Sequence, residues 1–289
     1  MNRKHFLKLS GATTLGLAIG SCAGGTKATG PKGTITDLGL QLYSLRDDLP
    51  KDPKGVLKQV ASFGYKTIES YEGKEGMFWG MSNKEFKKYM DDLGMRIISS
   101  HCDFKNDFER KAAEAGEIGM KYLLCPWLGK QKTLDDYKKA ADDFNKAGEI
   151  CKKNGLRFGY HNHDYAFRLQ DDQYPQDIII KETDPSLVDF EMDIYWVVTA
   201  GQDPVAWMQK HNGRFRLCHV KDRRKNTPFK EGESNQSCIV GQGSIDYKSI
   251  LGQAKKLGMQ HYILEQEAYE KAPLECVKED AAYLNNLVF

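Results

Sequence analysis

RFGYHNHD (157–164) is the first of four strand-like runs in the second half of the chain, followed by LVDFEMDIYW (187–196), RLCHVKD (216–222) and YILEQE (262–267). Each run is short enough for a buried strand and carries ionisable residues near its C-terminal end. Because successive side chains of a strand point to opposite faces, each run presents one or more ionisable groups on one face. Burying such groups without partners is costly, and a shared cation is the simplest partner.

Strand-like and helix-like segments alternate from residue 37 onward. The expected strands are 38–45, 66–70, 96–102, 121–128, 157–163, 187–194, 216–221 and 262–266. The expected helices are about 53–63, 82–94, 107–118, 134–154, 176–182, 204–210, 247–257 and 273–287. Eight strand–helix units in roughly 250 residues predict a single (β/α)₈ TIM barrel. No Gly-rich phosphate-binding motif follows the first strand, which argues against a dinucleotide-binding fold.

Composition narrows the class of protein further. The 289 residues are 40% apolar and 28% charged, as in an ordinary folded chain, and the formal net charge is +2. This charge gives no electrostatic case for nucleic-acid binding. The polar stretch 223–237 predicts either a mobile lid or a contact to another subunit, so a homo-oligomer is possible.

The N-terminal segment 1–22 has the pattern of an export signal. A basic start is followed by the apolar stretch 12–19 and then by small residues before Cys22. No apolar run reaches the roughly 18–20 residues that a membrane-spanning helix needs. Residues 23–36 are rich in Gly, Thr and Lys, which predicts a flexible tether ahead of a barrel over 37–289.

The end of this segment, Ile19-Gly20-Ser21-Cys22, resembles a bacterial lipobox, in which Cys22 would be lipidated. The start resembles a twin-arginine export motif with Lys4 in place of the second arginine. An ordinary cleaved signal is the alternative. We expect an exported protein of the periplasm or cell envelope, held at the membrane only by a lipid anchor.

The best candidate metal ligands are one histidine of the fifth strand, His161 or His163, with Asp193, His219 and Glu265. Mixed imidazole and carboxylate ligands predict one Mn²⁺, Zn²⁺ or Co²⁺ ion, with Fe²⁺ and Mg²⁺ as further possibilities. A structural alternative exists for Asp193, which can simply cap the next helix.

The remaining candidates would contact substrate. Lys221 and the second strand-five histidine would hold substrate oxygens, and Glu191 has a salt bridge to Lys221 as its structural alternative. Glu267 is expected at the rim. Further candidate contacts are Glu69, His101, Glu191 and Trp196, and a possible apolar wall consists of Trp196, Trp127, Tyr43 and Tyr71.

With these residues in place, the chain resembles the xylose-isomerase-like (β/α)₈ superfamily of sugar isomerases and epimerases. The matching features are GLQLYSLR (39–46), Glu69, YHNHD (160–164), D-x-x-W (193–196), HVKD (219–222), GQGSIDY (241–247) and LEQE (264–267). The resemblance implies one divalent metal, held by Glu, Asp, His and Glu on strands five to eight. The last three correspond to Asp193, His219 and Glu265.

The first ligand departs from this pattern, because His161 stands where ketose epimerases carry a metal-binding glutamate. In those enzymes two glutamates form the acid–base pair. Here the partner of Glu265 would be another group, such as His101, His163 or Glu191. The YHNH form resembles a branch associated with keto-glycosides and inositol derivatives, which leaves epimerisation, isomerisation and elimination open.

These features predict a metal-dependent sugar isomerase or epimerase acting on a carbohydrate or keto-sugar through an enediolate. Glu265 would transfer the proton with His161, His163 or His101 as counterpart, and Lys221 would stabilise negative charge. The alternatives are a lyase or hydrolase of 3-keto-glycosides and a non-catalytic carbohydrate-binding lipoprotein. A nuclease like the abasic-site enzymes of the superfamily is disfavoured by the net charge and the export signal.

Overall fold

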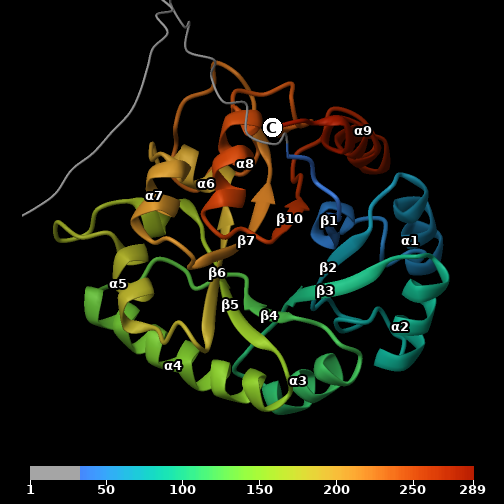
Figure 1. The fold of residues 1–289 in the computed structure, drawn as a ribbon, viewed down its shortest axis with the longest axis horizontal. Helices are drawn as coiled ribbons and strands as arrows, with labels where there is room; N and C mark the ends of the chain where they lie inside the picture. Colours follow the sequence, from blue (N-terminus) through green and yellow to red (C-terminus); the bar gives the residue numbers. More distant parts are fainter. Residues whose placement is uncertain (1–32) are drawn as a thin grey trace, which may run out of the picture. The chain divides into compact units, whose positions relative to one another are not determined.

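Parallel strands alternate with helices along residues 33–289, the part of the chain that a computed structural model describes. Eight strands of this part close into a barrel in the order β1-β2-β3-β4-β5-β6-β7-β10, and β10 pairs with β1. Helices surround the strands (Figure 1). The predicted TIM barrel is therefore confirmed. The predicted signal 1–22 and the part of the tether up to residue 32 lie outside the described residues.

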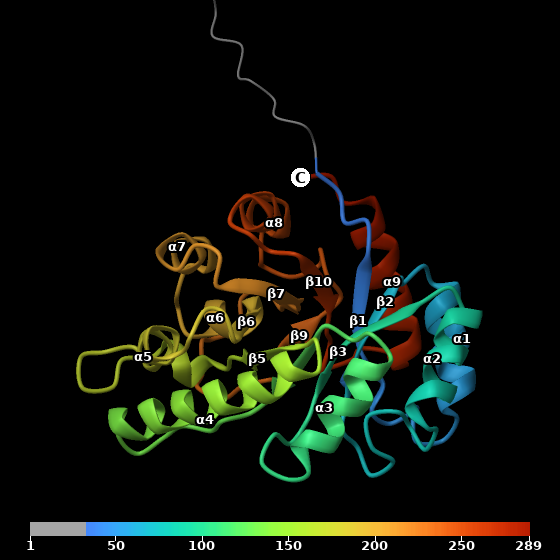
Figure 2. The same cartoon turned by 60° about the horizontal axis from the view of Figure 1, so that its bottom comes forward.

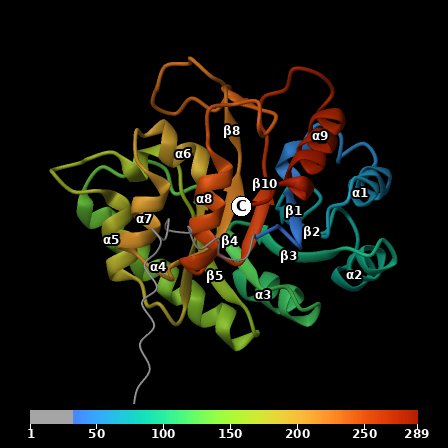
Figure 3. The same cartoon turned by 45° about the horizontal axis from the view of Figure 1, so that its top comes forward.

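The barrel strands are short. They are β1 Leu38–Gln41, β2 Thr67–Tyr71, β3 Arg96–His101, β4 Tyr122–Cys125, β5 Arg157–His161, β6 Val188–Asp193, β7 Phe215–Val220 and β10 His261–Leu264. The view in Figure 2 shows β1 beside β2 and β10. A two-stranded antiparallel ribbon of β8 (Asp222–Arg223) and β9 (Ser237–Cys238) is separate from the barrel. In Figure 3, β8 and the loops around it rise above the labelled β10 and β1.

The eight predicted helices follow the strands in the predicted order. The helices are α1 Pro53–Ser62, α2 Asn83–Asp92, α3 Phe108–Glu117, α4 Leu134–Lys153, α5 Pro175–Glu182, α6 Ile194–Thr199, α7 Pro204–Lys210, α8 Tyr247–Lys256 and α9 Pro273–Asn286, with 3₁₀ turns η1 Leu42–Leu45 and η2 Asp164–Phe167. Of these, α6 and the two 3₁₀ turns were not predicted. The predicted capping box of Ser82 and Glu85 opens α2. None of the helices in residues 33–289 is long and apolar enough to cross a membrane.

Several strands are shorter than predicted; the fourth ends at Cys125 rather than at residue 128, and the fifth at His161 rather than at residue 163. At the first and sixth strands a side-chain cap accounts for the end. The first strand ends at Gln41 rather than at residue 45, because the Gln41 side chain accepts a hydrogen bond from the Tyr43 backbone and starts η1. The sixth strand gives way at once to α6, whose sequence IYWVVT is rich in β-formers. Asp193 caps α6 by accepting from the Trp196 backbone N–H at 3.2 Å. A local cap thus overrides strand propensity at both places.

The barrel interior is divided into an apolar floor and a polar layer. The floor is a separate cluster of five buried side chains, Ile98, Tyr122, Leu124, Leu217 and Ile263. His219 and Glu265 each follow a floor residue by two positions, so they share its face one level nearer the C-terminal strand ends. Barrel enzymes carry their active sites at that end.

Candidate active site

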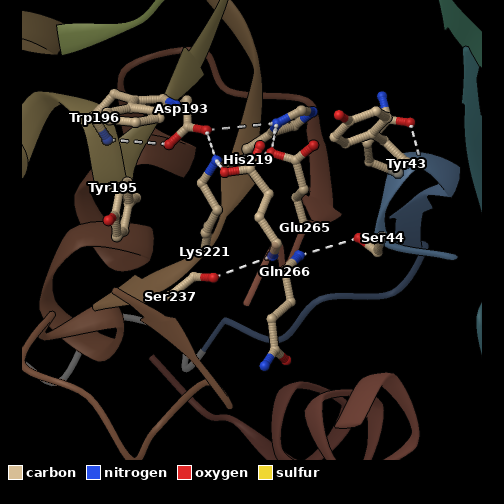
Figure 4. Close-up of polar contacts among 12 residues, drawn as sticks. Tyr43, Ser44, Asp193, Tyr195, Trp196, His219, Lys221, Ser237, Glu265 and Gln266 are labelled. Carbon is tan, nitrogen blue, oxygen red and sulfur yellow. Dashed lines mark hydrogen bonds and ion pairs between the residues drawn. The ribbon is translucent and has the colours of Figure 1, made fainter. Parts of the chain in front are cut away.

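Four side chains from neighbouring strands converge above the apolar floor. They are His161 at the end of β5, Asp193 at the end of β6, His219 in β7 and Glu265 directly after β10. His219 Nδ1 lies 3.1 Å from both His161 Nε2 and Glu265 Oε2, and His161 Nε2 lies 3.4 Å from Asp193 Oδ2. One donor atom from each residue lies within 4.8 Å of all the others. We call these four residues the outer cluster, part of which is drawn in Figure 4.

Of the two strand-five histidines, it is His161 that joins the outer cluster. His163 lies beyond the end of β5, with its ring centroid 5.0 Å from that of His161. It packs between Trp127 at 4.3 Å and Trp196 at 5.2 Å, and its Nδ1 is buried without a hydrogen-bond partner. His163 therefore lies next to the outer cluster without belonging to it, and its side chain lines the cavity described below.

Lys221 is fully buried and bridges two members of the outer cluster. Its Nζ lies 2.7 Å from Asp193 Oδ2 and 2.8 Å from Glu265 Oε2 (Figure 4). It also lies 3.5 Å from Glu267, which lines the pocket as a rim residue would. The alternative of a salt bridge from Glu191 to Lys221 is wrong, because Lys221 stands beyond the end of β7 at the level of Asp193.

Asp193 combines the two roles that the sequence left open. Its Oδ1 caps α6, while its Oδ2 faces Lys221 and His161. The cap fixes the carboxylate, because a residue that starts a helix is held by the backbone it satisfies. Lys221 Nζ also lies 5.2 Å from the rings of Tyr195 and Trp196, so α6 covers the ammonium with aromatic faces.

A second group, which we call the inner cluster, lies within reach of the same histidine. It consists of Glu69, His101, Glu191 and His219. His219 Nε2 lies 2.8 Å from Glu69 Oε1 and 3.3 Å from Glu191 Oε2, while His101 Nε2 lies 2.9 Å from Glu191 and 3.2 Å from Glu69. His219 thus belongs to both clusters, with Nδ1 in the outer one and Nε2 in the inner one. The sequence singled out all four residues but not this grouping.

A cavity of about 530 Å³ opens above the outer cluster. His101, His161, His163 and Glu265 line it, whereas Glu69 and Glu191 are fully buried away from it. Three of the four aromatic residues expected as an apolar wall line this cavity: Tyr43, Tyr71 and Trp127. Trp127 is 60% exposed and Tyr43 is 40% exposed, so both remain free to contact a ligand ring. Trp196 instead packs behind His163.

The protonation states differ sharply between neighbours. Burial lowers the pKa of His161 to about 4, so its imidazole is neutral near pH 7. Burial also lowers the pKa of His101, but Glu69 and Glu191 outweigh it and raise that pKa to about 9. Burial and the charge of Glu69 raise the pKa of Glu191 to about 7. A neutral imidazole offers a lone pair, which suits His161 to metal ligation.

Glu265 is ionised in spite of its burial. Desolvation alone would raise the pKa of its carboxyl, but the charges of Lys221 and His219 hold it well below the usual value. The outer cluster therefore offers two carboxylates, because the pKa of Asp193 is likewise lowered by Lys221 against the effect of burial. Two carboxylates and two imidazoles within ligand distance fit a divalent transition metal.

Two further motifs hold the rim of the site. Asp222, directly after Lys221, accepts hydrogen bonds from the backbone N–H groups of Arg223, Gly241, Gly243 and Ile245 at 2.7–3.1 Å. This contact joins the HVKD and GQGSIDY motifs. Within 223–237, the Gly232 N–H donates to Asp164 at 2.9 Å and Tyr195 Oη donates to the Glu233 carbonyl at 2.5 Å. The polar stretch therefore packs onto η2 and α6.

Comparisons with known proteins agree with this architecture. Residues 57–287 match the family model described as xylose isomerase-like TIM barrel. An inosose dehydratase from Mesomycoplasma hyopneumoniae is 24% identical over 277 residues, which cover 88% of this chain and 86% of that protein. A crystal structure of a sugar phosphate isomerase/epimerase from Parabacteroides distasonis is 32% identical, with a TM-score of 0.72, and covers 90% of this chain and 96% of that one.

A third similar structure is that of the IolI protein with a bound zinc atom. It is 16% identical with a TM-score of 0.69, and the match covers 86% of this chain and 95% of that chain. At this identity the likeness concerns the fold alone.

Proposed function

The chain belongs to the xylose isomerase-like TIM barrel family, and on this premise we propose that it is a divalent-metal-dependent enzyme that enolises a keto-sugar or related carbohydrate. The observation that carries the proposal is the outer cluster, in which two carboxylates and two imidazoles meet next to a cavity that His161 and Glu265 line. Such a set is expensive to bury unless it serves a ligand.

His161, Asp193, His219 and Glu265 would hold one ion, with Mn²⁺, Zn²⁺ and Co²⁺ as the best candidates. When bound, a divalent metal supplies a Lewis acid that favours negative charge on adjacent carbonyl and hydroxyl oxygens. The neutral His161 and the ionised Glu265 are both in the protonation state that ligation needs. Burial lowers the pKa of His219, but Glu191 and Glu265 outweigh it and raise that pKa, so His219 would give up its Nδ1 proton when the ion binds.

The chain's own groups can move the proton. Glu265 lines the cavity as a carboxylate and is our candidate base for the carbon next to the carbonyl. His163 and His101 line the same cavity and are candidates for the counterpart. Lys221 is buried behind Asp193 and Glu265, so it acts on the substrate through these carboxylates, by keeping them ionised and in place.

We propose further that the substrate carries no phosphate. Four acidic side chains line the cavity, Glu72, Asp103, Glu265 and Glu267, against one cationic group, His101, and no lysine or arginine is among the described residues that line it. A phosphate dianion would be repelled at short range by these acidic groups. A neutral carbohydrate would instead use the exposed rings of Tyr43 and Trp127 as apolar surfaces.

Two outcomes of enolisation are candidates. Return of the proton gives an isomer or epimer, which is our first candidate. Loss of a neighbouring hydroxyl or glycosidic oxygen gives elimination, the reaction of a dehydratase or of a lyase acting on 3-keto-glycosides. Elimination is the second candidate. It is supported by the relatives named inosose dehydratase and by His161, which leaves the outer cluster without the second strand-end glutamate of a two-glutamate epimerase.

The test is to strip the purified protein of metal, reload it with Mn²⁺, Zn²⁺ or Co²⁺ and incubate it with a panel of keto-sugars and inososes in D₂O. We expect deuterium at the carbon next to the carbonyl only with the loaded protein. A product of unchanged mass apart from deuterium identifies an isomerase or epimerase, loss of water a dehydratase, and two fragments a lyase or hydrolase. Sugar binding without exchange, and unaffected by metal removal, would replace the proposal by that of a carbohydrate-binding protein.

We also propose that the protein is exported and anchored in the cell envelope through a lipid on Cys22, with residues 23–36 as the tether. The lipobox-like sequence before Cys22 supports this proposal. Labelling cells with a radioactive fatty acid tests it, since the label should enter the wild type and not Cys22→Ser. An unlabelled wild type would contradict the anchor.

A further inference from the structure

The two ring nitrogens of His219 face different surroundings. Nδ1 lies among the outer cluster, 3.1 Å from both His161 and Glu265. Nε2 lies 2.8 Å from Glu69 Oε1, which makes this the shortest of the distances from the His219 ring to a carboxylate. Both side chains are completely buried, so solvent does not compete for this contact.

We propose that Glu69 is a positioning residue that holds His219 in the tautomer with the proton on Nε2, leaving the Nδ1 lone pair for the metal. The inference rests on the proposed metal site. A neutral imidazole has one N–H and one lone pair, so the acceptor at one nitrogen decides which nitrogen can ligate. Carboxylates that accept the second N–H of a ligating histidine fix its orientation and strengthen it as a ligand.

Glu69 is itself fixed from the first strand. Gln41 Nε2 donates to Glu69 Oε1 at 2.8 Å, and Gln41 Oε1 accepts from the Tyr43 backbone N–H at 2.9 Å. Gln41 and Glu69 are direct partners in the β1–β2 register. A continuous set of contacts therefore runs from the start of η1 through Gln41 and Glu69 to His219. This gives the Gln of the GLQLYSLR motif and the strand-two glutamate a common purpose.

The inner cluster by itself offers enough donors for a second ion, which is the competing explanation for Glu69. Both clusters, however, share the single lone pair of His219. A neutral His219 that ligates through Nδ1 has only an N–H to offer at Nε2, and that N–H points to an acceptor rather than to a cation. With one ion in the outer cluster, the Nδ1 lone pair of His219 binds the metal and its Nε2 N–H donates to Glu69, so each ring nitrogen has one partner.

The test compares metal affinity in Glu69→Leu, which removes the acceptor, and Glu69→Gln, which keeps an amide oxygen in its place. Glu191→Gln is the matched control, since Glu191 belongs to the same buried cluster but makes its shorter contact with His101 rather than His219. Equilibrium dialysis with Zn²⁺ and Co²⁺ alone gives the dissociation constant and the number of ions per chain. Nitrogen-15 NMR of the Zn²⁺-loaded protein reports the tautomer of His219.

We expect Glu69→Leu to weaken Zn²⁺ binding by about 10- to 100-fold. Glu69→Gln and Glu191→Gln should each change the dissociation constant for Zn²⁺ by less than about tenfold. In both variants the NMR spectrum should show the His219 proton on Nε2. If the wild type binds Zn²⁺ and Glu69→Leu binds it with the same dissociation constant, this inference is overturned and the proposed function still stands. Two ions per chain, one of them lost in both Glu69 variants, would overturn it by making Glu69 a ligand. No metal bound by the wild type would overturn the inference and the metal dependence together.

Discussion

Glu265 is the residue on which the proposed chemistry depends most. It lines the cavity, contacts His219 and Lys221 at 3.1 and 2.8 Å, and is held ionised. We predict that Glu265→Gln lowers kcat by about 10²- to 10⁴-fold, because the amide cannot accept the proton. Metal content and kcat should be measured on the same preparation, so that loss of the ion is separated from loss of the base.

Glu267→Gln is the control for this variant, because Glu267 lines the same cavity and lies farther from Lys221, at 3.5 Å. It should change kcat by less than about tenfold. Turnover close to wild type in Glu265→Gln with a full complement of metal would disprove the proton-transfer role.

At the residue scale, the sequence predicted which side chains face the barrel interior but not how they group there. Strand alternation correctly placed His219 and Glu265 on the inward face. Each follows an inward-facing residue, Leu217 or Ile263, by two positions, and alternate residues of a strand share a face. It did not choose between His161 and His163, since that depends on where β5 ends. Nor did it separate the inner from the outer cluster, because depth in a barrel depends on the stagger of neighbouring strands.

At the scale of elements, Asp222 ties the end of β7 to the loop before α8. Its two oxygens accept four backbone N–H groups, and a Cβ on Gly243 would overlap its carboxylate. Asp222→Asn turns one oxygen into a donor facing N–H groups, so we predict a loss of about 2–3 kcal/mol in the free energy of unfolding. Urea denaturation measures it.

Asp246→Asn is the matched control. Asp246 caps α8 by accepting a hydrogen bond from the Ser249 N–H, and asparagine is about as good a cap as aspartate. Its free energy of unfolding should stay within about 0.5 kcal/mol of the wild type. Equal stability of the two variants would mean that Asp222 does not hold this loop.

Asp280 in α9 gives the protein a pH-dependent stability. It is fully buried and accepts from the Val240 N–H at 2.7 Å, and burial raises the pKa of its carboxyl to about 8. In the unfolded chain it would ionise near its usual, much lower pKa. Between these two values only the unfolded chain releases the proton, so Asp280 lowers stability progressively as pH rises toward about 8, and no further above it.

We therefore predict that Asp280→Asn, which cannot ionise, gains stability relative to the wild type as pH rises from about 4 to about 8. The gain should then remain constant. Thermal unfolding of both proteins across this range measures the difference. A difference that does not vary with pH would show that Asp280 ionises normally in the folded protein.

The order of the elements was predictable because capping residues, glycine stops and buried strand runs recur through the chain. The capping box at Ser82 and the closed barrel of eight strands were both confirmed. Two of the elements that were not predicted, η1 and α6, begin where Gln41 and Asp193 cap the following turn with their own side chains. Gln41 also contacts Glu69, and Asp193 Oδ2 lies 3.8 Å from His219 Nδ1, so both capping residues are part of the surroundings of His219.

For the molecule as a whole, the outer cluster joins strands that are far apart in sequence, from β5 to β10, and Asp193, Glu265 and Lys221 hold one another there. An ion that binds the folded barrel and not the unfolded chain must raise its stability, by about 2.7 kcal/mol at 100 times the dissociation constant. At about 2–4 °C per kcal/mol for a domain of this size, we predict that Zn²⁺ or Mn²⁺ raises Tm by about 5–10 °C and that a chelator reverses the rise.

His219→Ala should abolish this shift, because it removes a donor from the outer cluster and from the inner one. His211→Ala is the control, since His211 pairs with Asp177 outside both clusters and its loss should leave the shift intact. A shift that survives His219→Ala would place the ion elsewhere on the chain. If none of the metals raises the Tm of the wild type, Lys221 alone neutralises the charges of Asp193 and Glu265. The cavity would then be a sugar-binding site that needs no metal.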